Sequence, residues 1–87
     1  MDTYRVRMLR GATRELALLD KTSGRRVLQR IRWLSEHIEL TMLKALKGEL
    51  SGLYRMREGD YRIIYQVLRK ENLIIIHSIG HRKDVYR

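Results

Sequence analysis

The segment from Leu53 to Tyr65 constrains the fold of this chain most, because it has the pattern of a β-hairpin whose register follows from its turn. Gly59 and Asp60 form a two-residue turn signal between two stretches of alternating apolar and polar residues. Such a loop predicts four opposed pairs: Glu58 with Tyr61, Arg57 with Arg62, Met56 with Ile63, and Tyr54 with Tyr65. Opposed residues share a face of the sheet, and the side-chain period is two. One face therefore carries the apolar set, and the other carries Arg55, Arg57 and Arg62.

The predicted arginine pair indicates a ligand that the sequence does not supply. Like charges directly opposed across two strands destabilise a sheet, so Arg57 and Arg62 suggest a bound anion, with phosphate as the leading candidate. The whole chain has nineteen Lys and Arg against ten Asp and Glu, a net charge of +9. This lies just above the magnitude of about 2–8 that solubility alone explains in a small domain. A polyanionic partner is therefore favoured: nucleic acid, an acidic protein or an anionic membrane.

Composition excludes several other classes of protein. The 87 residues fit one domain, 1–87, with a single modest core. The chain has no Cys, which excludes disulfides and thiolate metal sites and fits a cytoplasmic location. No apolar run approaches the roughly 20 residues of a membrane span, and four Arg in the first twenty residues do not fit a signal peptide. There is no P-loop or dinucleotide fingerprint, and we expect no metal and no cofactor.

The first half of the chain predicts one strand and two helices. Residues 3–9 alternate and predict a strand, and residues 12–20 have helical spacing. Thr22-Ser23-Gly24 is expected to break the chain there, with Ser23 or Thr22 capping a second helix that begins near Arg25. Its end is open, near Leu40 or near Lys47. Its predicted buried stripe comprises Val27, Leu28, Ile31, Leu34 and Ile38.

The second half of the chain has the period of strands. We expect strands near 53–58, 61–68 and 73–79, with Gly80 ending the last of them. The prediction is a small α+β domain of order β-α-α-β-β-β. Its two helices pack on one face of an antiparallel sheet and leave the arginine face open.

Two stretches carry a resemblance to a known family. They are LKGELSGLYRMREGDYRIIY at 46–65 and IGHRKDVY at 79–86, and both resemble the RelE/ParE toxin superfamily, its RelE branch in particular. The resemblance implies a RelE-like fold, a curved sheet with the active site on its concave face. It also implies a type II toxin held inactive by a cognate antitoxin. Members of the RelE branch are endoribonucleases that cut mRNA, typically in the ribosomal A site, without a metal ion.

The same resemblance implies roles for particular residues. Metal-free RNA cleavage uses the ribose 2′-hydroxyl as nucleophile, and it needs a base, a cationic site for the phosphorane and an acid. The residues that match catalytic positions are Arg55, Arg62, His81, Arg82 and Tyr86. Arg57, Lys47 and Lys83 are expected to bind RNA. Arginine is too basic to accept the proton, so we expect His81 as the general base, with Tyr86 as the second choice.

Two other functions stay open at this point. A ParE-like toxin would have the same fold and inhibit DNA gyrase without nuclease activity. A basic binding module for RNA or an acidic protein would show strong salt dependence without turnover. For either toxin, we expect an antitoxin whose acidic and apolar segment wraps the long helix or covers the basic face. We expect no membrane partner.

Overall fold

The computed structural model describes residues 3–40, 44–45 and 52–81. The elements in chain order are β1 (Arg5–Met8), α1 (Arg10–Ala17), α2 (Lys21–His37), a 3₁₀ turn (Ile38–Leu40), β2 (Lys44–Ala45), β3 (Tyr54–Glu58), β4 (Tyr61–Leu68), a 3₁₀ turn (Arg69–Glu71) and β5 (Leu73–His81). The predicted order of elements is confirmed, with the two-residue β2 as an addition. Neither α1 nor α2, nor any other described helical segment, has the length and apolar character needed to cross a membrane.

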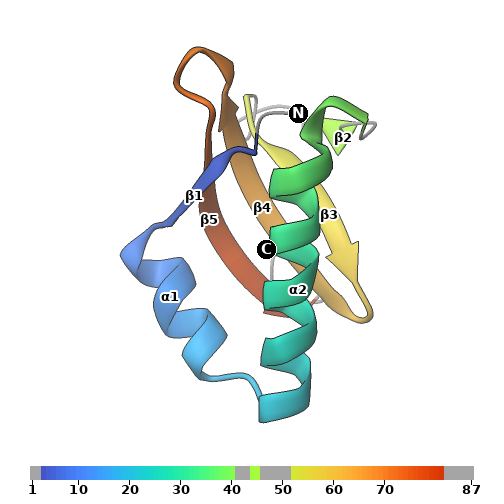
Figure 1. The fold of residues 1–87 in the computed structure, drawn as a ribbon. Coiled ribbons are helices and arrows are strands. Elements are labelled where there is room, and N and C mark those ends of the chain that lie inside the picture. The colour runs from blue at the N-terminus through green and yellow to red at the C-terminus, as the bar shows by residue number, and fades with distance from the viewer. Residues whose placement is uncertain (1–2, 41–43, 46–51, 82–87) are drawn as a thin grey trace.

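The five strands form one sheet in the order β1-β5-β4-β3-β2 (Figure 1). β2 to β5 pair antiparallel, whereas β1 pairs parallel to β5. The expectation of an antiparallel sheet therefore fails at this one edge. The physical reason is that no hairpin joins β1 to β5. The chain leaves β1 through α1 and α2 and reaches β5 only after β2, β3 and β4, so the reversal that a hairpin imposes does not apply to this pair.

The predicted hairpin register is confirmed at every pair. β3 and β4 oppose Tyr54 to Tyr65, Met56 to Ile63, Arg57 to Arg62 and Glu58 to Tyr61. Gly59 has a φ of +61°. Glycine adopts this conformation without strain, and a positive φ at the first turn position suits the right-handed twist of a hairpin.

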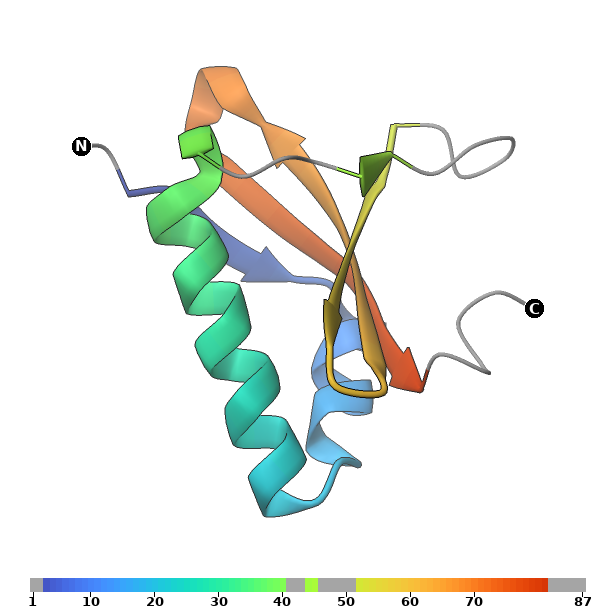
Figure 2. The same cartoon turned by 90° about the vertical axis from the view of Figure 1, so that its right-hand side faces the viewer.

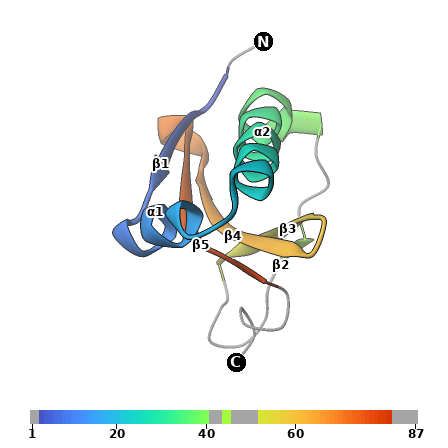
Figure 3. The ribbon, with the colours of Figure 1, turned by 90° about the horizontal axis from the view of Figure 1, so that it is seen from below.

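Both helices lie on one side of the sheet (Figures 2 and 3). Their buried residues Ala12, Val27, Ile31, Leu34 and Ile38 form the core together with Tyr4, Met56, Ile63, Tyr65, Ile74, Ile76 and Ile79. Leu28 was expected in the buried stripe, but it is 49% exposed. At 3.6 residues per turn it is rotated past Val27, toward a groove that α2 forms with β1.

The boundaries of the helices differ from the prediction in one informative way. α2 begins at Lys21, because Asp20 caps it by accepting a hydrogen bond from the Ser23 backbone N–H at 3.1 Å. Thr22-Ser23-Gly24 is therefore the first turn of the helix and not a break, and the predicted Thr22 or Ser23 cap is wrong. The hydrogen bonds from the hydroxyl and the amide of Ser23 hold the pKa of Asp20 below its usual value. α2 ends at His37 and continues as the 3₁₀ turn to Leu40, near the earlier of the two expected ends.

One extra residue in β5 interrupts its pairing with β4. Ile64 pairs with Ser78 and Tyr65 pairs with Ile76, so His77 is the residue that has no opposed partner. This β-bulge changes the alternation along β5. Ile74 and Ile76 before it, and Ile79 after it, all enter the core. β5 also continues through Gly80 to His81, so Gly80 does not end the strand as predicted.

α1 completes the edge of β5 that β1 leaves open. β1 pairs with β5 only from Leu73 to Ile76. Beyond that point the Glu15 side chain of α1 accepts a hydrogen bond from the backbone N–H of Ile79, with Oε1 and N at 2.9 Å. A side chain on a helix thus satisfies a strand donor that has no neighbouring strand.

Loss of this hydrogen bond should destabilise the protein. We expect Glu15→Ala to lower the free energy of unfolding by about 1–3 kcal/mol, the usual effect of leaving a partly buried donor unsatisfied. Glu15→Gln keeps an acceptor oxygen and should stay within about 1 kcal/mol of the wild type. Urea unfolding of the three proteins measures the difference. Equal losses in both variants would show that the hydrogen bond does not secure the end of β5.

The burial of Tyr65 makes the protein sensitive to high pH. Burial, together with the neighbouring Tyr54, raises the pKa of Tyr65 to about 12, against the opposing effect of Arg30. The unfolded value is about 10, so between these values the folded state keeps a proton that the unfolded state has lost. The free energy of unfolding should therefore fall as pH rises from 10 to 12. In Tyr65→Phe this contribution is missing, and the stability difference from the wild type should change with pH over that window in urea titrations. A pH-independent difference would contradict the assignment.

Candidate functional site

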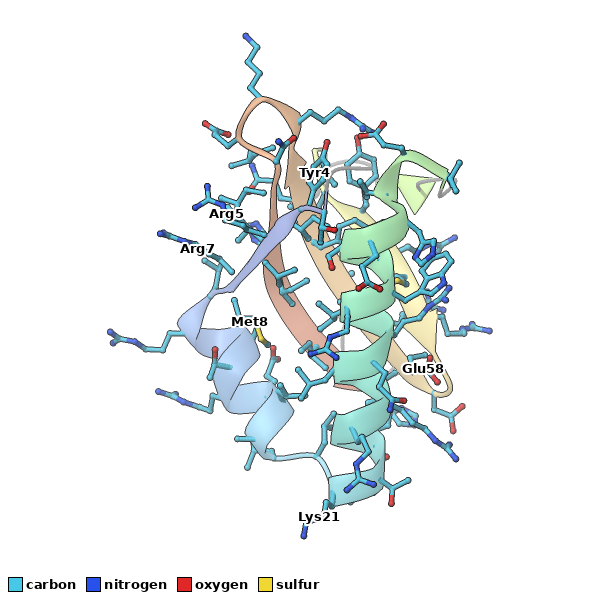
Figure 4. The ribbon with its side chains drawn as sticks, in the orientation of Figure 1. Tyr4, Arg5, Arg7, Met8, Lys21 and Glu58 are labelled. Atoms are coloured by element: carbon cyan, nitrogen blue, oxygen red, sulfur yellow. The ribbon has the colours of Figure 1, made fainter. Side chains whose placement is uncertain are left out.

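The face of the sheet opposite α1 and α2 is called the helix-free face below. The strand registers place on it Arg5 and Arg7 of β1, Ile75, Ser78 and Gly80 of β5, Arg62, Ile64 and Gln66 of β4, and Arg55 and Arg57 of β3. Figure 4 shows Arg5 and Arg7 directed away from α2, consistent with this assignment.

Three arginines gather at the β3–β4 end of the helix-free face. Arg57 and Arg62 oppose each other directly, and Arg55 lies two residues along β3 on the same face. Opposed Cβ atoms in such pairs are about 5 Å apart. Arg55 and Arg57 are exposed, and Arg62 is half-buried. On the other side of Arg62 its opposed residue in β5 is Gly80, which has no side chain. The register therefore gathers three guanidinium-bearing side chains at one end of this face.

The described strands place no carboxylate on the face of this cluster. Within the described strands the one acidic residue is Glu58, and it opposes Tyr61, whose ring packs against the core on the helix side. The ion pair between Arg69 and Glu39, with Nη1 and Oε1 at 3.6 Å, lies away from the cluster in the 3₁₀ turns. The positive potential of the helix-free face is thus not offset by carboxylates of the described strands, and the face attracts anions.

Ile64 forms the floor beside the arginines. It is only 3% exposed, yet it does not belong to the core on the helix side. It lies between Arg55 on β3 and Ser78 on β5. An apolar neighbour lowers the local dielectric constant, which strengthens the attraction between a guanidinium group and a bound phosphate.

His81 is not placed with the arginines. It opposes Tyr61 in the register, and the two rings meet edge to face with centroids 6.0 Å apart. Tyr61 packs against the helix-side core, so His81 lies on the face opposite Arg62. The bulge at His77 is the reason, because it shifts the alternation of every later residue in β5 by one position. His77 itself pairs with Gln66, with Nε2 and Oε1 at 3.1 Å, so its ring is hydrogen-bonded within the sheet.

The remaining predicted site residues, Lys47, Arg82, Lys83 and Tyr86, lie outside the described residues. Of the five expected catalytic residues the structure therefore brings Arg55 and Arg62 together, and Arg57 joins them. Sequence reasoning missed Arg5, Arg7, Ile64 and Gln66. The alternation of Arg5 and Arg7 with Val6 and Met8 indicated their face, but their neighbours depend on the register with β5. Among the described residues, no three His, Asp or Glu side chains are grouped closely enough to hold a metal.

A second surface feature lies between β1 and α2. It is a groove of about 430 Å³ with an apolar floor of Val6, Met8, Leu28 and Ile31 and polar walls of Arg25, Gln29, Arg32 and Ser35. Val6 and Leu28 are 36% and 49% exposed, which is high for large apolar side chains beside a core. β1 is also the last strand at this end of the sheet. We call this feature the β1–α2 groove.

A family model decides what kind of protein this is. The model for the ParE toxin of the type II toxin–antitoxin system parDE matches residues 6–86. The chain belongs to the RelE/ParE toxin superfamily. This confirms the resemblance found in the two sequence stretches.

Individual relatives come from the RelE side of the superfamily. The toxin RelG of Mycobacterium tuberculosis is 36% identical over 44 residues, and the match spans about half of each chain, 51% of both. The RelBE2 toxin–antitoxin complex of the same organism contains a chain with a TM-score of 0.85 and 30% identity, covering 97% of both chains. The archaeal RelE-RelB complex of Pyrococcus horikoshii contains a chain with a TM-score of 0.73 and 32% identity. The match covers 97% of this chain and 100% of that one. The toxin therefore has a RelE-like fold.

Proposed function

We propose that this toxin is an endoribonuclease that cleaves mRNA without a metal ion, on the translating ribosome in the A site. The observation that carries the proposal is the cluster of Arg55, Arg57 and Arg62 on a face whose described strands place no carboxylate there. Membership of the superfamily and the similarity to RelE-type toxins support it. The residue roles come from the resemblance of the two sequence stretches to the RelE branch.

The arginines suit one part of the reaction in particular. The ribose 2′-oxygen attacks the adjacent phosphorus, the bond to the 5′-oxygen breaks, and the products are a 2′,3′-cyclic phosphate and a free 5′-hydroxyl. Guanidinium groups bind the non-bridging oxygens and stabilise the additional negative charge of the phosphorane. Arg62 is suited to hold the scissile phosphate, because it is half-buried between Arg57 on β3 and Gly80 on β5 and the buried Ile64 lowers the dielectric constant.

The two proton transfers need other groups. A base removes the proton of the 2′-hydroxyl, and an acid protonates the leaving 5′-oxygen. Arginine stays protonated at neutral pH and serves neither role well. His81, the first choice from the sequence, lies on the far face of the sheet with Tyr61. We therefore assign proton transfer to Tyr86, the second choice, and the additional phosphate contact to Arg82.

Removal of Arg62 should reduce the rate of cleavage and leave the fold intact. We expect Arg62→Ala to lower kcat by about 10²–10³, as loss of a transition-state charge stabiliser does. His81→Gln is the matched control from the same sheet, and its kcat should fall by less than about tenfold. The assay is cleavage of message on purified, programmed ribosomes, with end analysis for the cyclic phosphate. A message with a 2′-deoxy nucleotide at the cut should resist.

Two outcomes would contradict this assignment. If His81→Gln is as damaging as Arg62→Ala, His81 acts in the reaction despite its position. If the wild-type protein blocks growth without cutting message, the nuclease proposal fails. The match to the ParE model favours gyrase inhibition as the alternative, and a DNA supercoiling assay tests it directly.

We also infer that the partner of this toxin is a cognate antitoxin. Solved relatives include a RelBE2 toxin–antitoxin complex and an archaeal RelE-RelB complex. The β1–α2 groove fits an acidic and apolar segment, because its floor is apolar and Arg25 and Arg32 line it. The sequence leads us to expect an antitoxin either on the long helix or on the basic face. The β1–α2 groove belongs to the first of these two surfaces.

A charge placed in the β1–α2 groove should weaken the complex. Leu28→Glu should raise the Kd for the antitoxin by about 10–100-fold, the effect of losing the burial of one leucine. Leu18→Glu is the matched control, because Leu18 is 80% exposed and lies outside the groove. Calorimetric titration of each purified toxin with the antitoxin encoded beside it measures both values. Equal weakening by the two variants, or none by Leu28→Glu, would exclude this groove as the docking site.

A further inference from the structure

The helix-free face carries a second pair of arginines that the proposed cleavage chemistry does not use. Arg5 and Arg7 lie on β1, where they oppose Leu73 and Ile75 of β5. Ile75 in turn opposes Gln66 of β4. Both arginines are exposed, and Figure 4 shows their side chains pointing away from the helices. They therefore lie on the same face as Arg55, Arg57 and Arg62, at the opposite edge of the sheet.

The separation of the two arginine groups is that of an extended ligand. From Arg62 to Gln66 the strand advances four residues, about 13 Å, and from β4 to β1 there are two strand spacings, about 9.5 Å. The diagonal from Arg62 to Arg7 is therefore about 16 Å. An extended oligonucleotide can lie over backbone positions this far apart and contact both groups.

The surface between the two groups is suited to such a ligand. Along the diagonal lie Ile64, Ser78 and the hydrogen-bonded pair of Gln66 and His77. These are neutral or weakly polar groups, and the described strands add no carboxylate that would repel a phosphate. Among the described strands the positive charge is thus confined to the two ends of the path, and the half-buried Gln66, His77 and Ser78 in the middle offer hydrogen-bonding contacts.

Protection of an edge strand is the simpler explanation for charges on β1. Edge strands often carry charged side chains, Lys especially, that discourage pairing with another sheet. That role is filled by charge of either sign and on either face. Here both residues are Arg, the side chain that grips phosphate bidentately, and both lie on the face of the arginine cluster. Edge protection does not require this coincidence.

We propose that Arg5 and Arg7 form a distal phosphate subsite, so that the helix-free face binds a single RNA strand diagonally from the arginine cluster at β3–β4 to β1. The choice of RNA rests on the proposed function. The ligand chemistry is the phosphodiester backbone of RNA, and its two possible sources are the message and ribosomal RNA.

The test measures binding and needs no turnover. The β1 double variant combines Arg5→Gln with Arg7→Gln. The control is an α1 double variant that combines Arg10→Gln with Arg14→Gln and removes the same charge from the exposed side of α1. One probe is a fluorescent single-stranded RNA of about eight nucleotides, within the usual site sizes of such proteins, and the second is a dinucleotide. A third assay measures sedimentation with empty ribosomes. Thermal unfolding checks that each variant is folded.

The β1 variant should bind the longer RNA or the ribosome about 5- to 30-fold more weakly at low salt. The slope of log K against log salt should become less steep by about 1.4. This is the effect of losing two phosphate contacts, at about 0.7 each for a single strand. Dinucleotide binding should not change. Loss on the free RNA identifies the message as the ligand, and loss on the ribosome alone identifies ribosomal RNA. The double change of Arg5 and Arg7 to Lys keeps the charge and should restore most of the binding.

Failure of the subsite and failure of the proposed function give different results. If the β1 variant binds both the RNA and the ribosome like the α1 control, the subsite does not exist, even when the wild-type protein cleaves message normally. If the wild-type protein binds RNA with the expected dependence on Arg5 and Arg7 but cuts nothing, the subsite stands and the nuclease proposal falls. An equal loss of dinucleotide binding would also exclude a distal subsite.

Discussion

The pairing of β4 with β5, including its one extra residue, is the constraint on which the rest of the structure depends. These two strands are the centre of the sheet, and their register decides which side chains meet the helices. The bulge at His77 lets Ile74 and Ile76 before it, and Ile79 after it, enter one core. Without the bulge, strict alternation would send Ile79 to the helix-free face and leave a gap beneath the helices.

The same register creates the site at a cost in stability. Like charges directly opposed across two strands repel each other, and Arg57 and Arg62 are such a pair. A bound phosphate reverses this repulsion, so the energy that the fold loses is recovered when an anionic ligand arrives. Gly80 is the residue opposed to Arg62 on β5, and a glycine within a strand weakens it slightly because it has no side chain to pack.

The two surfaces of interest lie on different parts of the molecule. The arginine cluster is on the helix-free face, and the β1–α2 groove is on the helix side, between α2 and the edge strand β1. β1 contributes to both, with Val6 and Met8 toward the groove and Arg5 and Arg7 toward the helix-free face. An antitoxin segment in the groove would therefore lie beside the proposed distal subsite, and steric or electrostatic interference with RNA binding there follows from the geometry of one short strand.

The amino-acid sequence determined the hairpin register, the two faces of β3 and β4, and the helix-side core. These depend on local signals: a Gly59-Asp60 turn, a period of two, and a period of 3.6. The Asp20 cap was also local, and the Thr22-Ser23-Gly24 run obscured it. Tertiary structure alone decided the parallel pairing of β1, the exposure of Leu28, the hydrogen bond from Ile79 to Glu15 and the placement of His81. Each of these depends on which distant segment lies alongside, and a bulge leaves no signature in the alternation of Ile74 to Ile79. One inserted residue was enough to move a histidine from the face of the arginines to the face of the helices.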